Sequence, residues 1–331
     1  MIRDKILVIA EAGVNHNGSL ALAKEMAYVA RECGADIVKY QTSISSTSKY
    51  SEKANYQKRE TGDEGSQLDM IKKLRLSFDE HIKLKEYCDS IGIKYLSTPF
   101  DFESIDFLNK LCDIWKIPSG EIINVPYLER ISQYPKEIIM STGMSDLSEI
   151  QNALDILQSR ISNKITLLQC TTQYPTPYCD INLRVLRTLK EKFNLEVGLS
   201  DHSLGIEVPI AAVALGATVI EKHFTLDKNM SGPDQKASVD PHELKQMIIS
   251  IRNVVQALGA SEKVVCDSER ENMYVARKSI VALRDIKKGE VFSVDNIVPR
   301  HAGHGIEASQ WYNVLGKKAK RDFIEDDMIE I

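Results

Sequence analysis

Eight short segments rich in apolar and β-branched residues recur along the first part of the chain and alternate with stretches of helical spacing. The predicted strands are residues 6–10, 36–40, 94–98, 114–118, 137–142, 165–170, 197–201 and 218–223. The predicted helices are residues 20–33, 78–91, 102–111, 147–157, 183–193, 205–215 and 242–258. Alternation of this kind indicates parallel βαβ units. Eight units in about 260 residues match the usual length of a (β/α)₈ barrel.

We therefore predict an α/β fold with a TIM barrel over residues 1–260. An open, doubly wound sheet is the alternative, but no GxGxxG motif follows the first predicted strand. Beyond the barrel, residues 261–277 are polar and charged, which indicates a linker. Residues 278–331 contain only short strand-like pieces and form a small module. Units below about 60 residues bury little surface, so we expect this module to pack on another surface.

Composition and charge exclude several classes of protein. The 331 residues include 42 Lys and Arg against 47 Asp and Glu, a net charge of −5. Such a chain has no field that attracts nucleic-acid phosphates or anionic lipid, so we predict neither partner. The first apolar run ends at Glu11 and is too short for a signal sequence or a membrane span. The six cysteines form no CxxC pair and are expected to be reduced thiols. We therefore expect a cytoplasmic protein.

Polar side chains stand at the carboxyl end of every predicted strand, where a TIM barrel carries its chemistry. They include Glu11, Lys39, Gln41, Thr98, Lys116, Ser119, Glu121, Ser141, Thr172, Tyr174, Ser200, His202, Glu221 and His223. An uncompensated ammonium is costly to desolvate, so Lys39 and Lys116 inside the mouth predict a bound anion. Neighbouring hydroxyls add donors, which suits a phosphate together with a carboxylate. A Schiff-base aldolase that uses either lysine is the competing chemistry.

A second candidate feature is the pair His202 and His223, at the ends of adjacent strands. Two imidazoles that converge without a nearby thiolate suggest an exchangeable divalent metal. We expect Mn²⁺, with Co²⁺, Zn²⁺ or Mg²⁺ as alternatives. We expect Cys170, at the end of a buried run, to belong to the core.

The remaining polar groups suit a second substrate that carries hydroxyl or amide groups. Glu121 is the best placed general acid or base, although it is equally suited to cap a helix beginning near Asn124. Glu11, Gln41 and Asp234 are left to contact the second substrate.

These residues fall within motifs that resemble the sialic acid (N-acetylneuraminate) synthase family, which includes legionaminate synthases. The resemblance covers nearly the whole chain. It rests on residues 10–18 (AEAGVNHNG), 38–42 (VKYQT), 97–100 (STPF), 116–121 (KIPSGE), 141–144 (STGM), 174–177 (YPTP), 198–202 (GLSDH) and 221–225 (EKHFT).

The resemblance implies condensation of phosphoenolpyruvate with an open-chain N-acetylated mannosamine-type sugar and water, giving a nine-carbon 2-keto acid and phosphate. It assigns the phosphoenolpyruvate contacts to Lys39, Thr98, Lys116, Ser119, Ser141 and Ser200. It assigns the metal to His202 and His223, and sugar contacts to Glu11, Gln41, Tyr174 and Asp234. Thr172 joins the substrate-binding set. We expect Glu11, Glu121, Lys39 and Lys116 to do the catalytic work.

The C-terminal module resembles the antifreeze-like (SAF) domain of these synthases. In that family an arginine of this domain reaches into the barrel of the partner subunit, and Arg300 occupies that position. The resemblance therefore implies a swapped homodimer. A protein that acts through this module alone, with the barrel as scaffold, is a third hypothesis.

Two departures from the family pattern matter. The loop that usually reads Arg-Pro-Gly-x-Gly-Ile is here residues 300–306, RHAGHGI, and its histidines have no assigned role. The turn after the sixth strand has Thr171 and Thr172 where many N-acetylneuraminate synthases carry an asparagine, and this resembles the legionaminate type. The sugar is therefore either N-acetylmannosamine, our main expectation, or the less polar 2,4-diacetamido-2,4,6-trideoxymannose.

Overall fold

The computed structural model describes residues 6–62, 65–159 and 164–331. The chain divides into two compact units, Met1–Gly259 and Ala260–Ile331, which are described in turn.

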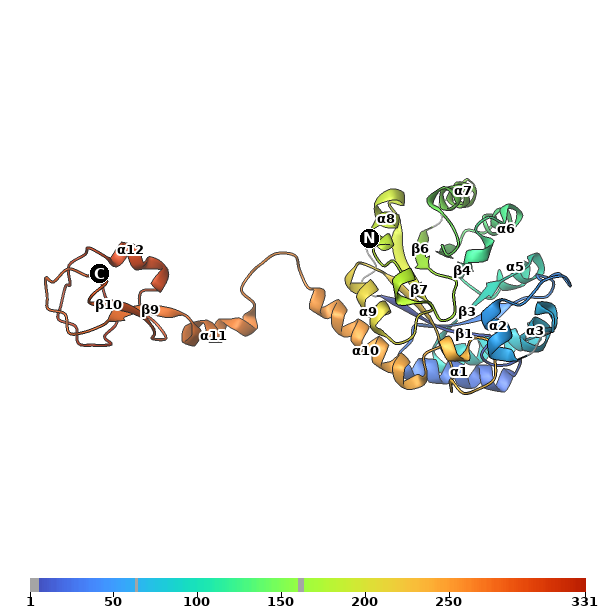
Figure 1. Ribbon diagram of the computed structural model, residues 1–331, viewed down its shortest axis with the longest axis horizontal. Helices are drawn as coiled ribbons and strands as arrows, with labels where there is room; N and C mark the ends of the chain where they lie inside the picture. The colour runs from blue at the N-terminus through green and yellow to red at the C-terminus, as the bar shows by residue number, and fades with distance from the viewer. Residues whose placement is uncertain (1–5, 63–64, 160–163) are drawn as a thin grey trace. The chain divides into compact units, whose positions relative to one another are not determined.

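The first unit is built on one parallel sheet that contains all eight predicted strands (Figure 1). The strands are β1 (Leu7–Gly13), β2 (Ile37–Thr42), β3 (Lys94–Pro99), β4 (Ile114–Ile117), β5 (Glu137–Ser141), β6 (Ile165–Cys170), β7 (Glu196–Asp201) and β8 (Val219–His223). Their order is β3-β2-β1-β8-β7-β6-β5-β4, so β1 lies between β2 and β8. β3 also packs against β4, which brings the two ends of the sheet together. The predicted TIM barrel is confirmed.

Helices surround this sheet, as Figure 1 shows. They are α1 (Leu20–Cys33), α4 (Phe78–Ile91), α5 (Phe102–Leu108), α6 (Val125–Ile131), α7 (Leu147–Gln158), α8 (Val185–Phe193), α9 (Glu207–Ala214) and α10 (Pro241–Leu258). Polar residues mark where they begin: Ser77 and Glu80 form a capping box on α4, and Asp240 and Glu243 form one on α10. Among the described residues, no helix is long and apolar enough to cross a bilayer.

Two further helices, α2 (Asn55–Thr61) and α3 (Gln67–Leu74), lie in the long connection between β2 and α4 and were not predicted. Both are short, and α2 buries none of its residues, so neither has the long apolar period that reveals a helix in sequence. Gly18 lies close to the end of α3, where no other residue would fit. A side chain at Gly18 would bring its Cβ within 2.4 Å of the Lys73 carbonyl oxygen, and the Gly18 φ of +75° is itself unfavourable for other residues.

The barrel core consists of aliphatic side chains from the strands and the inner faces of the helices. Trp115 and Tyr127 are among its largest fully buried members. The Tyr127 hydroxyl donates to the Pro99 carbonyl, 2.9 Å away, so the buried polar group is satisfied. Packing in this core therefore positions the strands whose carboxyl ends carry the polar residues.

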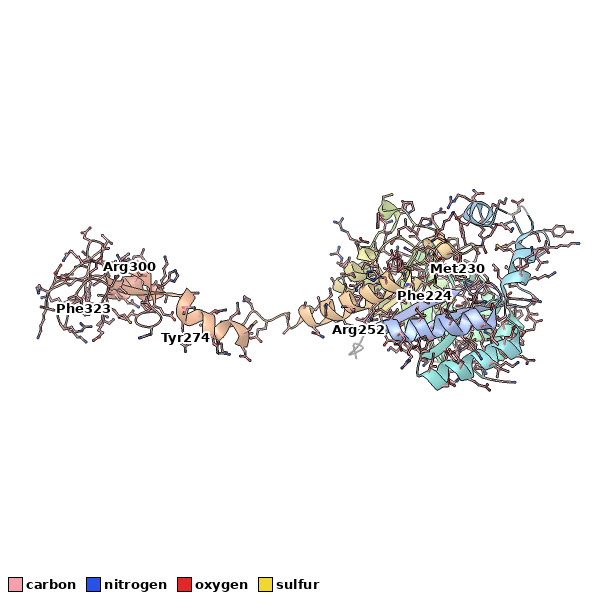
Figure 2. All side chains as sticks on the ribbon, turned by 90° about the horizontal axis from the view of Figure 1, so that it is seen from below. Phe224, Met230, Arg252, Tyr274, Arg300 and Phe323 are labelled. Carbon is pink, nitrogen blue, oxygen red and sulfur yellow. The ribbon has the colours of Figure 1, made fainter. Side chains whose placement is uncertain are left out.

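The second unit contains α11 (Asp267–Ala276), β9 (Lys278–Ala282), β10 (Ile297–His301) and α12 (Trp311–Val314). β9 and β10 pair antiparallel, and Phe292 and Phe323 pack in a separate small core. Figure 2 labels Phe323 and Arg300 in this unit. α11 falls within the segment predicted to be a linker. It forms there because the Glu269 carboxylate accepts from the Cys266 amide at its start, 3.0 Å away.

Candidate active site

A pocket of about 200 Å³ opens where the barrel strands end, and it brings together most of the predicted site residues. Its lining includes Glu11, Lys39, Gln41, Thr98, Lys116, Ser119, Ser141, Thr172, Tyr174, Ser200, His202 and His223. We call it the inner pocket. An adjoining outer chamber of about 390 Å³ is lined in part by Glu121 and Asp234, and it shares Gln41, Phe100, Tyr174 and His223 with the inner pocket.

Arg300 is the one predicted site residue that belongs to the second unit. It lies on β10, where its guanidinium pairs with the carboxylates of Asp326 and, at 3.9 Å, Glu325.

The two lysines of the inner pocket are buried and face a common carboxylate. Lys39 Nζ lies 2.8 Å from Glu11 Oε2 and 3.7 Å from Glu221 Oε1. Lys116 Nζ lies 3.5 Å from the same Glu221 oxygen. The two ammonium groups therefore already have carboxylate partners within the pocket, and the bound anion expected from the sequence stays a prediction. The carboxylates of Glu11 and Glu221 balance the charges of the two lysines. An anion that enters the pocket competes with these carboxylates for the ammonium groups.

The carboxylates differ in how strongly they hold a proton. Burial raises the pKa of Glu11 to about 7, and repulsion from Glu221 adds to this against the attraction of Lys39. For Glu221, burial opposes ionisation, but Lys116 and Lys39 outweigh it and lower the pKa. Burial also lowers the pKa of Lys116. Glu11 is thus the carboxyl of the inner pocket whose proton is exchangeable near neutral pH.

Hydroxyl groups surround the ammonium groups. Thr98 Oγ1 accepts from Lys39 Nζ at 3.1 Å, and Ser141 Oγ accepts from Lys116 Nζ at 2.8 Å. The Ser200 hydroxyl donates to Glu221 Oε1 at 3.2 Å, and Ser119 Oγ accepts from the Gly143 amide at 3.0 Å. These contacts leave a set of cationic and hydroxyl donors around one small space, which suits a phosphate or carboxylate.

The imidazoles of His202 and His223 lie side by side, with ring centroids 5.2 Å apart. His202 Nδ1 lies 2.7 Å from the Thr171 carbonyl oxygen, so this nitrogen donates, and Nε2 is the nitrogen that carries the lone pair when the ring is neutral. Within the part of the chain that the structure describes, His223 Nδ1 is buried without a hydrogen-bond partner, and it lies 3.7 Å from Asp234 Oδ2. Burial holds the pKa of His223 well below its usual value, so the ring is neutral.

These features fit two imidazole ligands for a divalent cation, one of them oriented by a carbonyl acceptor. Within the described residues, no group of three His, Cys, Asp or Glu side chains is arranged to hold a metal ion. A cation bound here would therefore need further ligands from water or substrate.

The outer chamber carries the remaining acids. Glu121 ends a 3₁₀ turn, and its Oε2 accepts from Asn124 Nδ2 at 2.5 Å. Asn124, and not Glu121, is the N-cap of α6, so the capping alternative for Glu121 is wrong. Burial raises the pKa of Glu121, and burial raises that of Asp234 to about 6. Both side chains are placed to exchange protons with a ligand in the chamber.

Several lining residues were not in the predicted site. Glu221 lines the inner pocket, although from the sequence it has no assigned role beyond that of a polar strand end. It stands two residues before His223 and so shares its face of β8. Cys170 is buried as expected but lines the inner pocket, its Sγ 3.9 Å from His202 Nδ1. Tyr56 stacks on Tyr174, ring centroids 4.8 Å apart, and no sequence signal pointed to it.

Comparison with known proteins assigns the fold and pocket to a class. A model described as the NeuB family matches residues 26–263, and one described as the SAF domain matches residues 277–330. The chain belongs to the NeuB family and is an enzyme of the nonulosonic acid synthase type. The family resemblance seen in the sequence is confirmed.

Individual proteins of this class are similar to the chain over most of its length. The N,N'-diacetyllegionaminic acid synthase of Campylobacter jejuni is 49% identical, over 98% of this chain and 99% of its own. The enzyme of that name from Legionella pneumophila is 46% identical, over 94% of this chain and 89% of its own. Among solved structures, the N-acetylneuraminic acid synthetase of Leptospira borgpetersenii has a TM-score of 0.70 at 33% identity, covering 81% of this chain and 90% of that chain.

Proposed function

We propose that the enzyme condenses phosphoenolpyruvate with an open-chain N-acetylated aminohexose and water, giving a nine-carbon 2-keto sugar acid and phosphate. The observation that carries the proposal is the inner pocket, where Lys39 and Lys116 flank Glu221 beside the neutral ring of His223. The two ammonium groups can bind the phosphate and the carboxylate of a phosphorylated carboxylic acid, and the adjoining outer chamber has room for a sugar.

Of the two sugars left open by the sequence, we propose 2,4-diacetamido-2,4,6-trideoxymannose as the substrate. This replaces N-acetylmannosamine as our first choice. Two relatives at 49% and 46% identity are both N,N'-diacetyllegionaminic acid synthases. Thr171 and Thr172 agree with that assignment, and Thr172 lines the inner pocket.

In the proposed reaction the phosphate and carboxylate of phosphoenolpyruvate take the place of Glu221 as partners of the two lysines. C3 of phosphoenolpyruvate forms a bond to the aldehyde carbon of the sugar. Water adds at C2, and phosphate leaves with the ester oxygen, so C2 becomes the ketone. Of the two protons that this water loses, one goes to the departing phosphate and the other to the alkoxide formed from the aldehyde oxygen. Glu11, with its pKa near neutrality, is placed to relay the proton to that alkoxide. Glu121 exchanges protons from the chamber side.

A divalent cation completes this proposal. The Nε2 of His202 and an imidazole nitrogen of His223 would hold it. The Thr171 contact occupies Nδ1 of His202 and leaves Nε2 for a ligand bond, and among the described residues His223 has a buried nitrogen without a hydrogen-bond partner. Bound there, Mn²⁺ would act as a Lewis acid that polarises the aldehyde oxygen.

The test is phosphate release from phosphoenolpyruvate with Mn²⁺ and each sugar, with the product identified by mass. We expect a nine-carbon keto acid from the diacetamido sugar. Absence of phosphate release with both sugars would overturn the proposal.

One observation favours a second candidate, a Schiff-base aldolase. Burial lowers the pKa of Lys116, and a neutral amine is what such an enzyme needs. Borohydride reduction in the presence of pyruvate would attach a three-carbon adduct to Lys116 in an aldolase. The synthase would remain unlabelled.

We further propose a cytoplasmic homodimer in which Arg300 contacts the sugar held by the partner subunit, as the family resemblance implies. Arg300 is paired only with partly or largely exposed carboxylates among the described residues, and all six cysteines are free thiols. Sedimentation of the purified enzyme tests the dimer directly.

A further inference from the structure

The helix α3 presents an apolar face to the outer chamber instead of to the barrel core. Gln67, Met70, Ile71 and Leu74 all line the chamber, and their spacing of three, four and seven residues places them on one face of the helix. An amphipathic helix usually buries such a face against the hydrophobic core. Here Met70, Ile71 and Leu74 stand outside the main core cluster of the described barrel. We call these three residues the α3 wall.

The helix that carries the α3 wall is capped at its start and anchored to another segment of the barrel at its end. The Ser66 hydroxyl accepts from the Asp69 amide at the start of α3, 3.1 Å away. At its other end, Arg75 Nη1 donates to the Ile44 carbonyl at 2.9 Å. The close approach of Gly18 to Lys73 completes the support. A rigid wall of this kind can discriminate between ligands by shape and polarity.

The wall lies beyond the part of the chamber that adjoins the inner pocket. Gln41, Phe100, Tyr174 and His223 line both spaces, whereas the α3 wall lines the outer chamber and not the inner pocket. A sugar whose aldehyde lies beside His223 and that fills the outer chamber can therefore reach the α3 wall with its opposite end.

Polar groups along the chamber suit the middle of such a sugar. The hydroxyls of Ser43 and Ser46 lie 2.7 Å apart on the chamber lining, and the amide side chain of Gln67 also lines it. Hydroxyl and amide groups of this kind can bind an acetamido substituent. The three side chains of the α3 wall carry no group that would donate to or accept strongly from a terminal hydroxyl, although Gln67 and Arg75 line the chamber beside them.

We propose that the α3 wall is a specificity subsite for the end of the sugar remote from the aldehyde, and that it selects a terminal methyl group over a hydroxymethyl group. This inference rests on the proposed function, because it assumes an aldose in the outer chamber. A hydroxyl placed against the wall loses its hydrogen bonds to water without replacement. Apolar pockets reject an added hydroxyl only moderately, so a preference of about 10- to 100-fold is expected.

The experiment uses two open-chain alditols that cannot react and that differ in one oxygen atom: 2-acetamido-2-deoxymannitol and 2-acetamido-2,6-dideoxymannitol. Their affinities for the full-length enzyme are measured by calorimetry with phosphoenolpyruvate and Mn²⁺ present. We expect the 6-deoxy compound to bind at least about tenfold more tightly.

Variants of α3 test whether the preference for the 6-deoxy compound arises at the α3 wall. Leu74→Gln and Met70→Gln each place an amide on the wall that can hydrogen-bond to the terminal hydroxyl. We expect each to reduce the ratio of the two affinities at least about threefold. Leu68→Gln is the matched control, since Leu68 is on the same helix but does not line the chamber. Phosphoenolpyruvate affinity, measured in parallel, should stay unchanged in all three and shows that the inner pocket is intact.

Equal binding of the two alditols to the unaltered enzyme would overturn the subsite. So would a ratio that survives both wall variants, or one that falls as far in Leu68→Gln. The proposed function is judged separately by turnover. If the enzyme binds the two alditols selectively but releases no phosphate, the subsite proposal stands and the synthase proposal is wrong. If it turns over substrate but binds the two alditols equally, the synthase proposal stands and the subsite proposal is wrong.

Discussion

Lys222 Nζ lies 2.5 Å from Asp201 Oδ2, and both side chains are buried directly beside the pair of histidines in sequence. Asp201 precedes His202 at the end of β7, and Lys222 precedes His223 at the end of β8. The alternation of side chains along a strand turns the ion pair away from the pocket and the imidazoles toward it. The ion pair therefore ties together the two strand ends that present the histidines.

Removing one partner of this pair should destabilise the barrel. In Lys222→Met the Asp201 carboxylate stays buried without its cation, which costs about 3–5 kcal/mol in the free energy of unfolding. Urea denaturation measures it. Lys228→Met is the control, because Lys228 makes an ion pair of equal length, 2.5 Å to Glu243, at a site about one-third exposed. We expect a loss within about 1 kcal/mol there. Similar losses in both variants would contradict the role assigned to the buried pair.

Lys116→Met should impair the use of phosphoenolpyruvate. The variant removes one of the two buried cations and leaves Glu221 with Lys39 alone. We expect kcat/KM for phosphoenolpyruvate to fall at least about 100-fold, since loss of a buried charged partner costs about 3–5 kcal/mol. Lys94→Met, at an exposed ion pair with Asp113, should leave kcat/KM within about twofold. An active Lys116→Met enzyme would contradict the anion pocket.

The stability of the barrel should fall in mild acid because of His81. This side chain is buried between Thr42 and Tyr95, with contacts of 3.2 and 2.9 Å. Burial lowers its pKa to about 4, so the unfolded chain binds a proton between about pH 6.5 and 4 that the folded chain does not. The contribution of the neutral His81 side chain to the free energy of unfolding is therefore complete above pH 6.5. It is lost as the pH falls toward 4, by up to about 3 kcal/mol.

Urea midpoints at pH 7 and pH 4.5 measure this effect. In His81→Gln the difference between the two pH values should shrink. The exposed His242→Gln should keep the full difference. An unchanged pH dependence in His81→Gln would assign the acid sensitivity to other groups.

The proposed role of Arg300 in the partner subunit predicts complementation. Lys116→Met and Arg300→Ala should each be nearly inactive alone. If the arginine crosses between subunits, a mixed dimer contains one site with both residues intact. Random mixing then gives about a quarter of the unaltered activity. Arg284→Ala, at an exposed ion pair with Glu290, should retain full activity by itself. Absence of recovery in the mixture would mean that the arginine does not act across subunits.

Much of this architecture is predictable because it follows local rules. The alternation of strands and helices specifies the barrel, and parallel strands bring polar ends such as Lys39 and Lys116 to one edge. What escaped prediction depends on contacts between distant residues. That Glu221 lies between both lysines depends on which side chains point inward, and the close approach of Gly18 to the end of α3 joins residues far apart in the sequence. Short polar segments such as α2 carry no periodic signal that would reveal them.

The most direct test of the central claim follows the oxygen that joins phosphorus to carbon in phosphoenolpyruvate. We would supply phosphoenolpyruvate labelled with ¹⁸O at that position, together with 2,4-diacetamido-2,4,6-trideoxymannose and Mn²⁺. The account predicts ¹⁸O-labelled phosphate and an unlabelled nine-carbon keto acid, because water supplies the oxygen of the new ketone. Label retained in the keto acid would contradict the proposed order of bonds made and broken, and no consumption of phosphoenolpyruvate would contradict the function itself.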